Sequence, residues 1–143
     1  MRCENVMKRT VECVSTHDTV QVAANIMREK QIGFLPVCDA SRKVVGTLTD
    51  RDITTRLVAQ NQPGSAHVES IMTHDVVSCS PSEDVRTAEE LMARNHKSRI
   101  MCLDIEGKPV GVISLSDIAQ FESDKRAART MREIATRESA LGI

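Results

Sequence analysis

The 143-residue sequence has no tryptophan and no tyrosine, and its aromatic residues are limited to Phe34 and Phe121. Its formal net charge is −1, so neither sign of charge dominates. Proteins that bind single-stranded nucleic acid usually combine a basic groove with aromatic side chains on which bases stack. The composition therefore argues against nucleic acid as a partner. Any nucleobase bound here has to lie between aliphatic side chains.

Long apolar runs are also lacking, since no stretch approaches the ~18 residues of a membrane-spanning helix. Residues 1–5 show no apolar signal region, which favours a cytoplasmic protein with no membrane partner. The five cysteines are scattered and form no Cys-x-x-Cys pair. We therefore expect neither a disulfide framework nor a structural metal site. The four histidines share no helical spacing and are interpreted as turn and surface residues: His17, His67, His74 and His96.

Signatures of catalysis are missing as well. The sequence has no Gly-x-Ser-x-Gly elbow, no phosphate-binding P-loop, no metal-spaced His/Asp cluster and no cysteine with a local activator. We predict that the chain is not an enzyme and uses no catalytic cofactor.

The chain contains an internal repeat. A shift of 65 residues aligns 6–53 with 71–118 without a gap, and twelve of the 48 pairs are identical. Each copy predicts a β-α-β-β-α order. The expected strands are 11–14, 34–38 and 44–48 in the first copy and 76–79, 100–103 and 110–113 in the second. The expected helices are 20–30, 51–57, 85–95 and 115–121.

One copy is too small to bury an adequate core alone. We therefore predict an α/β (α+β) fold in which the two repeats pack sheet to sheet with pseudo-twofold symmetry. The expected boundaries are 1–62 for the first repeat, 63–122 for the second and 123–143 for a C-terminal helix. That helix, from about Ser123 to Ser139, is amphipathic. Its predicted apolar face consists of Ala127, Ala128, Met131, Ile134 and Ala135.

The most informative stretch is 46–52, Gly-Thr-Leu-Thr-Asp-Arg-Asp, with its second copy 111–117, Gly-Val-Ile-Ser-Leu-Ser-Asp. In both, a buried strand is expected to run directly into a helix. Thr49 and Ser114 then fall at the N-cap, and Asp52 and Asp117 in the first turn. The open amides of such a turn suit a phosphate, and a nearby aspartate can accept hydrogen bonds from a ribose. The same pattern also describes a helix that merely caps itself.

These motifs resemble the CBS domain (the cystathionine β-synthase accessory domain). The resemblance is carried by Val-Val-Gly-Thr-Leu-Thr-Asp-Arg-Asp-Ile at 44–53 and Pro-Val-Gly-Val-Ile-Ser-Leu-Ser-Asp-Ile at 109–118, with the lead-in segments 5–7 and 70–73. It covers residues 6 to about 121 and makes the chain similar to a stand-alone tandem CBS pair, or Bateman module. It implies a sensor of adenosine-containing ligands, AMP, ADP or ATP foremost, with S-adenosylmethionine and NAD as further choices.

The resemblance also implies two ligand sites in clefts between the repeats. The first is expected to use Thr49, Asp52, Asp75, Val76, Lys97 and Ser98. The second is expected to use Ser114, Ser116, Asp117, Arg99, Thr10, Val11, Ile32 and Gly33. Arg99 resembles a phosphate-contacting arginine of the gamma subunit of AMP-activated kinase, whereas Phe34 stands at its equivalent in the first repeat. We therefore expect the second site to favour phosphorylated ligands more strongly.

A competing hypothesis is a scaffold that binds no ligand and only dimerises or docks on a separate enzyme or transporter. Under either hypothesis we expect a homodimer and a regulated partner protein that the sequence does not identify. The predicted dimer surface consists of apolar positions on the outer helices: Ile53, Leu57, Val58, Ile118 and Phe121.

Overall fold

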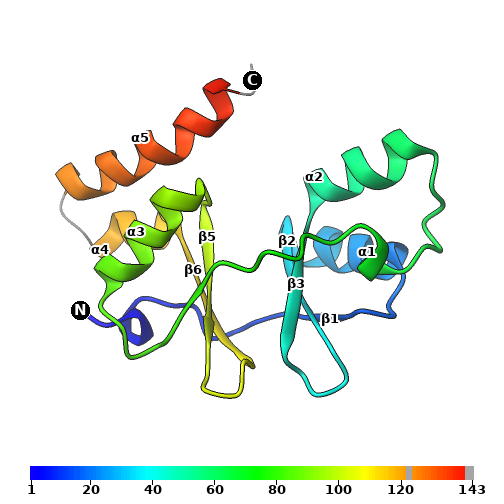
Figure 1. Cartoon of the computed structure of the whole chain (residues 1–143), viewed down its shortest axis with the longest axis horizontal. Coiled ribbons are helices and arrows are strands. Elements are labelled where there is room, and N and C mark those ends of the chain that lie inside the picture. Colours follow the sequence, from blue (N-terminus) through cyan, green and yellow to red (C-terminus); the bar gives the residue numbers. More distant parts are fainter. Residues whose placement is uncertain (122–123, 141–143) are drawn as a thin grey trace. The chain divides into compact units, whose positions relative to one another are not determined.

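The computed structural model describes residues 1–121 and 124–140. Contacts divide the chain into two compact units, Glu12–Val76 and Met1–Val11 together with Val77–Ile143. Each unit contains one three-stranded sheet, so the predicted mixed α/β class is confirmed (Figure 1). The N-terminal lead-in segment thus belongs to the unit that contains the second repeat's strands. The repeat boundaries at 62 and 122 divide the chain by sequence similarity, and they stay a prediction.

The unit Glu12–Val76 is built on a sheet of order β1-β2-β3. Its elements are β1 (Val14–Ser15), α1 (Val20–Lys30), β2 (Phe34–Cys38), β3 (Val44–Thr49) and α2 (Asp50–Asp52). β1 runs parallel to β2, and β2 runs antiparallel to β3. A π-helical segment, Ile53–Leu57, continues α2. The hydroxyls of Thr54 and Thr55 donate to carbonyls four residues earlier, a competition with the main chain that disturbs regular helix.

The other unit repeats this plan with the order β4-β5-β6. Its elements are β4 (Ser78–Cys79), α3 (Val85–Asn95), β5 (Arg99–Leu103), β6 (Pro109–Ser114), α4 (Leu115–Phe121) and α5 (Asp124–Ala140). β4 is parallel to β5, and β5 is antiparallel to β6. In both units the first strand is shorter than predicted, because only two of its residues form the parallel ladder with the next strand.

Helix α1 begins and ends where local chemistry dictates. The Thr19 hydroxyl accepts from the Val22 amide at 3.2 Å, and Gln31 ends the helix in the left-handed conformation with φ 55°. Its buried positions, Val20, Ala23 and Met27, are spaced three and four apart. Helix α3 follows the same pattern from Asp84 to His96.

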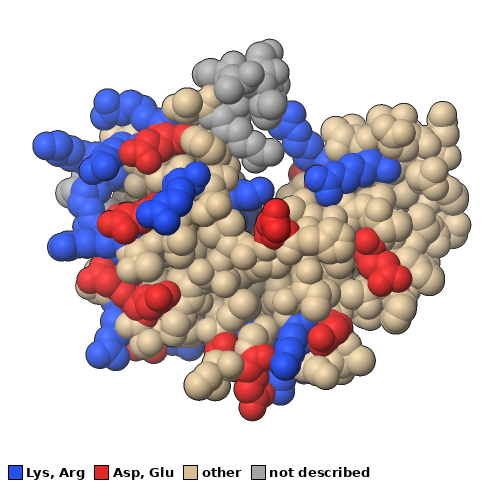
Figure 2. All heavy atoms as spheres, in the orientation of Figure 1, with Lys and Arg blue, Asp and Glu red and all other residues tan. Residues whose placement is uncertain are grey.

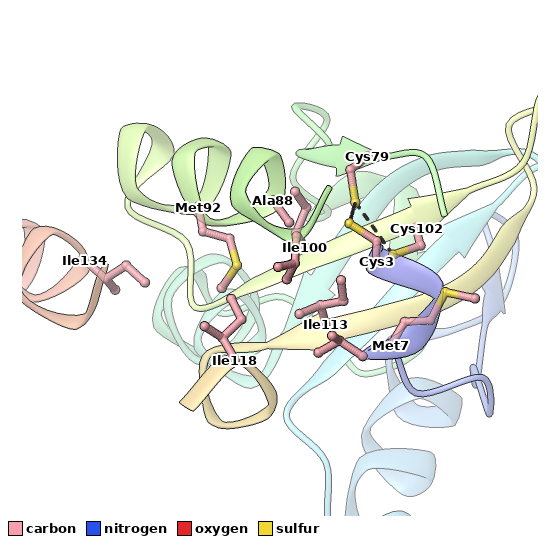
Figure 3. Close-up of a cluster of buried hydrophobic side chains, with 12 residues drawn as sticks. Cys3, Met7, Cys79, Ala88, Met92, Ile100, Cys102, Ile113, Ile118 and Ile134 are labelled. Atoms are coloured by element: carbon pink, nitrogen blue, oxygen red, sulfur yellow. Dashed lines mark hydrogen bonds between the residues drawn. The ribbon is translucent and has the colours of Figure 1, made fainter. Parts of the chain in front are cut away.

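A core of aliphatic side chains and sulfur atoms fills the unit that contains α3 (Figure 3). The thiol of Cys79 lies 3.7 Å from that of Cys3 and 3.6 Å from that of Cys102. All five cysteines are free. Cys3 is fully buried, and its amide donates to the Glu83 carbonyl at 2.8 Å. The lead-in segment is therefore part of this core.

Helix α5 packs against α3 and α4, but only part of the predicted apolar face is buried. Ile134 and Thr130 are buried, whereas Met131 is 52% exposed and Ala135 is also exposed. The prediction was wrong for these two because Arg126, four residues before Thr130, pairs with the buried Glu89 of α3. That ion pair turns the row 126, 130 and 134 toward α3. Ser123, the predicted start, lies outside the described residues.

Three of the histidines are exposed as predicted, namely His17, His67 and His74. His96 is instead half-buried, because its Nδ1 lies 2.8 Å from the Glu133 carbonyl oxygen of α5. None of the helices within residues 1–121 and 124–140 has the length and hydropathy needed to cross a bilayer.

Candidate functional site

The start of α4 closes a tight ring of hydrogen bonds around Ser114 and Asp117. Asp117 Oδ2 accepts from the Ser114 amide at 2.9 Å and from the Ser114 hydroxyl at 2.8 Å. In return the Ser114 hydroxyl accepts from the Asp117 amide at 3.2 Å. The hydroxyls of Ser114 and Ser116 lie 2.8 Å apart. Ser114 therefore caps the helix as predicted, and one oxygen of Asp117 is used by that cap.

The other carboxylate oxygen of Asp117 faces a cation. Asp117 Oδ1 lies 3.5 Å from Nζ of Lys8, a side chain that is 73% exposed. Lys8 reaches it because the lead-in segment pairs with β6, the Lys8 and Val112 main chains exchanging bonds of 2.9 and 3.0 Å. Arg99 is exposed and pairs with Ser114 across the β5–β6 ladder. The Lys8 side chain thus contacts this helix start, and Arg99 lies across the ladder from its capping residue.

The start of α2 has the same cap with a different cation. The Thr49 amide donates to Asp52 Oδ2 at 3.0 Å, and the Asp52 amide donates to the Thr49 hydroxyl at 3.1 Å. The next amide, that of Asp50, donates to the Gly33 carbonyl at 3.1 Å. Asp52 Oδ1 lies 3.8 Å from Nε of Arg56, one helical turn onward. Both predicted N-caps are therefore confirmed.

Arg56 is held by other acceptors as well. Its Nη1 donates to the carbonyls of Ile71 and Met72 at 3.1 and 3.3 Å, and to the Thr73 hydroxyl at 3.3 Å. The guanidinium of Arg56, which lies in the π-helical segment Ile53–Leu57, therefore anchors residues 71–73 of the second lead-in segment. This segment also pairs with β3, since Thr47 and Thr73 exchange two main-chain bonds of 2.9 Å. The Nη1 donors of the cation beside Asp52 are thus occupied by neutral oxygens of this segment.

The structure brings part of each predicted residue set into one unit. Ser114, Ser116, Asp117, Arg99, Thr10 and Val11 share one unit, and Thr49, Asp52, Asp75 and Val76 share the other. Thr10 and Asp75 are exposed, whereas Val11 and Val76 are half-buried. The contributions of Ile32 and Gly33 to the Asp117 site, and of Lys97 and Ser98 to the Asp52 site, stay predictions.

Within their own units, these four residues have local roles. The Gly33 carbonyl accepts from the Asp50 amide at the start of α2. The Ser98 carbonyl accepts from the Leu115 amide at 2.9 Å at the start of α4. The Ile32 amide donates to the Met27 carbonyl at 3.0 Å, and the Lys97 amide donates to the Met92 carbonyl at 2.9 Å. Each pair thus closes the helix before it and leads into the next strand.

Sequence reasoning missed Lys8 and Arg56. Both depend on contacts between the lead-in segments and the helix starts, which lie far apart along the chain. A signal did exist in the repeat. Two of its identical pairs are Met7/Met72 and Gly46/Gly111, and the methionine of each repeat contacts the glycine of the other repeat. A β-carbon on Gly111 would lie 2.4 Å from Met7 Sδ, and one on Gly46 would lie 2.6 Å from Met72 Sδ.

A separate groove of about 340 Å³ lies between α3 and α5. Its charged lining residues carry both signs, namely Arg86, Glu89, Glu90, Arg94, Arg126, Arg129 and Glu133. Figure 2 shows basic and acidic side chains interleaved over this part of the surface. Such a mixture offers no single-sign field to a polyanion.

The chain matches known proteins across most of its length. The CBS domain family matches it twice, over residues 3–59 and 68–124. The CBS domain-containing protein YhcV of Bacillus subtilis is 32% identical over 125 residues, which are 87% of this chain and 88% of the relative.

Solved structures agree with this match. A conserved CBS domain protein of unknown function from Thermoplasma acidophilum superposes with a TM-score of 0.81 at 25% identity, over 93% of this chain and 75% of that one. The CBS domain pair of protein MJ0100, solved in complex with 5′-methylthioadenosine and S-adenosyl-L-methionine, superposes with a TM-score of 0.75 at 25% identity. That match covers 84% of this chain and 94% of the other.

Proposed function

Because the chain belongs to the CBS domain family, we propose that it is a regulatory module that binds an adenosine-containing ligand at the start of α4. It acts by binding and not by catalysis. Asp117 Oδ1 receives ribose hydroxyls, while Ser114, Ser116 and Arg99 lie on the phosphate side. Thr10, Val11, Ile32 and Gly33 complete this site, and the set Thr49, Asp52, Asp75, Val76, Lys97 and Ser98 forms a second site at α2.

The observation that carries this proposal is that the two oxygens of the Asp117 carboxylate have different partners. Oδ2 serves the helix cap, and Oδ1 points to an exposed lysine instead of a main-chain amide. The side chain of that lysine is 73% exposed, and its Nζ lies 3.5 Å from Oδ1, farther than the about 2.7–2.9 Å of a charge-assisted hydrogen bond. A ligand hydroxyl can therefore take its place beside Oδ1 at little cost. The related CBS pair of MJ0100, solved with two adenosyl compounds, supports the ligand class.

Charge favours phosphorylated ligands, AMP, ADP or ATP, at the α4 start. Lys8 and Arg99 are both exposed there. At the α2 start the nearby cation, Arg56, already donates to three oxygens, and Phe34 stands opposite Thr49 in the ladder. Ligands without phosphate, such as S-adenosylmethionine, fit the α2 start better.

Titration calorimetry of the full chain against AMP, ADP, ATP, NAD, S-adenosylmethionine and 5′-methylthioadenosine tests the proposal. Asp117→Asn is the decisive variant, because an amide oxygen can still accept from the Ser114 amide while the negative charge is lost. We expect at least about a tenfold loss of affinity, which corresponds to about 1.4 kcal/mol.

Asp104→Asn is the matched control. Asp104 also accepts main-chain amides, from Glu106 and Lys108 at 2.9 Å each, but it lies in the β5–β6 turn. Its substitution should leave ligand affinity unchanged. Equal affinity in the wild type and in both Asp117→Asn and Asp52→Asn would refute the site assignment.

A ligand-free scaffold is the second candidate, and the reciprocal Thr49–Asp52 cap favours it, since this cap satisfies the helix start without a ligand. The absence of heat with all six ligands, together with a stable dimer, would support the scaffold. We propose a cytoplasmic homodimer under either function, acting on a separate regulated protein. Five free thiols suit a reducing compartment.

Two of the five apolar positions predicted for a dimer surface are buried and cannot contribute to it. Leu57 and Ile118 are 4% and 0% exposed, because they fill the cores of their own units. Val58 and Phe121 remain available, at 65% and 47% exposed. Val58→Asp combined with Phe121→Asp should therefore shift the mass measured by light scattering from dimer to monomer, whereas Ile105→Asp, at a fully exposed turn position, should not.

A further inference from the structure

Two imidazoles and a carboxylate meet on the surface of the unit Glu12–Val76. His17 lies in the turn between β1 and α1, and His67 and Glu69 lie around the 3-10 turn Val68–Ser70. Their donor atoms all lie within 4.8 Å of one another. The distance from His17 Nδ1 to Glu69 Oε1 is 3.8 Å, and the two imidazole rings are 5.8 Å apart in an edge-to-face arrangement.

The backbone holds the two segments that carry these three side chains in a fixed relation. The Val68 amide donates to the Asp18 carbonyl at 2.8 Å, and the Glu69 amide donates to the Thr16 carbonyl at 3.3 Å. Thr19 and His67 form an antiparallel bridge. Val68 itself is fully buried in the core. The side chains are therefore exposed and free to rotate, while the two segments that carry them are anchored.

The other unit has equivalent main-chain hydrogen bonds, here called the frame, but it lacks the imidazoles. Shifted by 65 residues, the frame becomes the Cys3 amide bound to the Glu83 carbonyl at 2.8 Å and the Glu4 amide bound to the Pro81 carbonyl at 2.9 Å. Arg2 stands at the position of His67, and Ser82 at that of His17. Arg2 forms an ordinary ion pair with Glu4, at 3.6 Å. The carboxylate is thus common to both frames, and the histidines are specific to one.

We propose that His17, His67 and Glu69 form a binding site for a divalent transition-metal ion, with Zn²⁺ as the best fit. Imidazole nitrogen and carboxylate oxygen are ordinary zinc ligands at about 2.0–2.2 Å, whereas Mg²⁺ and Ca²⁺ prefer all-oxygen sites. Tetrahedral donors at those bond lengths lie about 3.3 Å apart. Rotation of exposed side chains from their present separations closes that difference. Three protein ligands leave a coordination position for water or for another ligand.

This site does not depend on the adenosyl ligand or on the helix starts. Zinc there would cross-link the start of α1 to the segment that leads into residues 70–76. Binding to the native state alone raises the melting temperature with metal concentration.

The test is calorimetry of the chelator-treated full chain with ZnCl₂, with MgCl₂ as the control ion. We expect one Zn²⁺ per chain, a higher melting temperature and no response to Mg²⁺. The key variant is His17→Ser with His67→Arg, which copies the frame of the other unit. It should fold and should bind zinc at least tenfold more weakly. His74→Ala, an exposed histidine of the same unit, should bind as the wild type does.

Cobalt substitution separates this site from the five thiols. Ligation by nitrogen and oxygen gives visible d–d bands without a sulfur-to-cobalt charge-transfer band. A strong charge-transfer band, unchanged zinc affinity in the double variant, an equal loss in His74→Ala, or no zinc binding by the wild type would each overturn the proposal.

Discussion

Nζ of Lys8 lies 3.5 Å from Oδ1 of Asp117, across 109 positions of sequence. The lysine is 73% exposed and the aspartate 7%. The pair exists because the lead-in segment forms a main-chain pair with β6. It places the carboxylate that we propose binds the ribose beside an exposed cation that can also reach a phosphate.

Lys8→Met should therefore change ligand preference more than stability. Because the lysine end of the pair is 73% exposed, water can replace Nζ beside Asp117 Oδ1, and we expect the free energy of unfolding to fall by about 1 kcal/mol. We expect AMP to bind about three- to tenfold more weakly, because one of two cations at the α4 start is lost. 5′-Methylthioadenosine, which has no phosphate, should bind equally well or better, since Asp117 Oδ1 becomes free. Calorimetry with both ligands checks this. An equal loss for both would contradict the assignment of Lys8 to the phosphate side.

The crosswise methionine–glycine contacts predict different outcomes at equivalent positions. At Gly111, the nearest obstacles to a β-carbon are all atoms of the Met7 side chain. At Gly46 they include the Thr73 carbonyl oxygen at 2.8 Å, which a side-chain movement cannot relieve. Gly46→Ala should therefore cost more stability than Gly111→Ala, with both in the range of about 1–3 kcal/mol.

Double variants sharpen this comparison. Met7→Leu should relieve much of the Gly111→Ala penalty, whereas Met72→Leu should relieve little of the Gly46→Ala penalty. Urea denaturation gives the two coupling energies. Equal coupling in both pairs would mean that the backbone at Thr73 yields as readily as a methionine side chain.

The thiol of Cys13 predicts a pH effect. Burial, assisted by the neighbouring Cys38, raises the pKa of Cys13 from 9.0 to about 12. Because the thiol ionises more readily in the unfolded chain, its stabilising contribution is complete below pH 9 and is lost between pH 9 and about 12. Cys13→Ala should flatten the fall in melting temperature over that range under reducing conditions. The chain has no tyrosine to titrate there. A parallel fall in both proteins would refute this origin.

Much of the fold was predictable because its signals are local. The apolar spacing of Val20, Ala23 and Met27 defines α1. The reciprocal hydrogen bonds between Thr49 and Asp52, three residues apart, define the start of α2. Such signals act within one turn of helix, so the sequence alone contains them. The repeat presents these local signals twice in the same order.

Long-range contacts were not predictable from the same patterns. Neither Lys8 nor Arg56 stands out in sequence, since exposed cations are common on any helix or loop. Their partners depend on which strand each lead-in segment joins, and this choice follows from the packing of Met7 and Met72 over the glycines. The face of α5 was mistaken for a related reason, because an ion pair between Arg126 and Glu89 outweighed the apolar spacing.

Arg56 gives the last prediction. Its Nη1 donates to the carbonyls of two buried residues, Ile71 and Met72, and to the Thr73 hydroxyl. Arg56→Met keeps much of the aliphatic stem but leaves those acceptors without their donor, so unfolding free energy should fall by about 1–3 kcal/mol. Arg51→Met, at an exposed position of the same helix, should stay within about 0.5 kcal/mol of the wild type. Urea denaturation compares the two. Similar values would show that the second lead-in segment is held by its main-chain pairing with β3 alone.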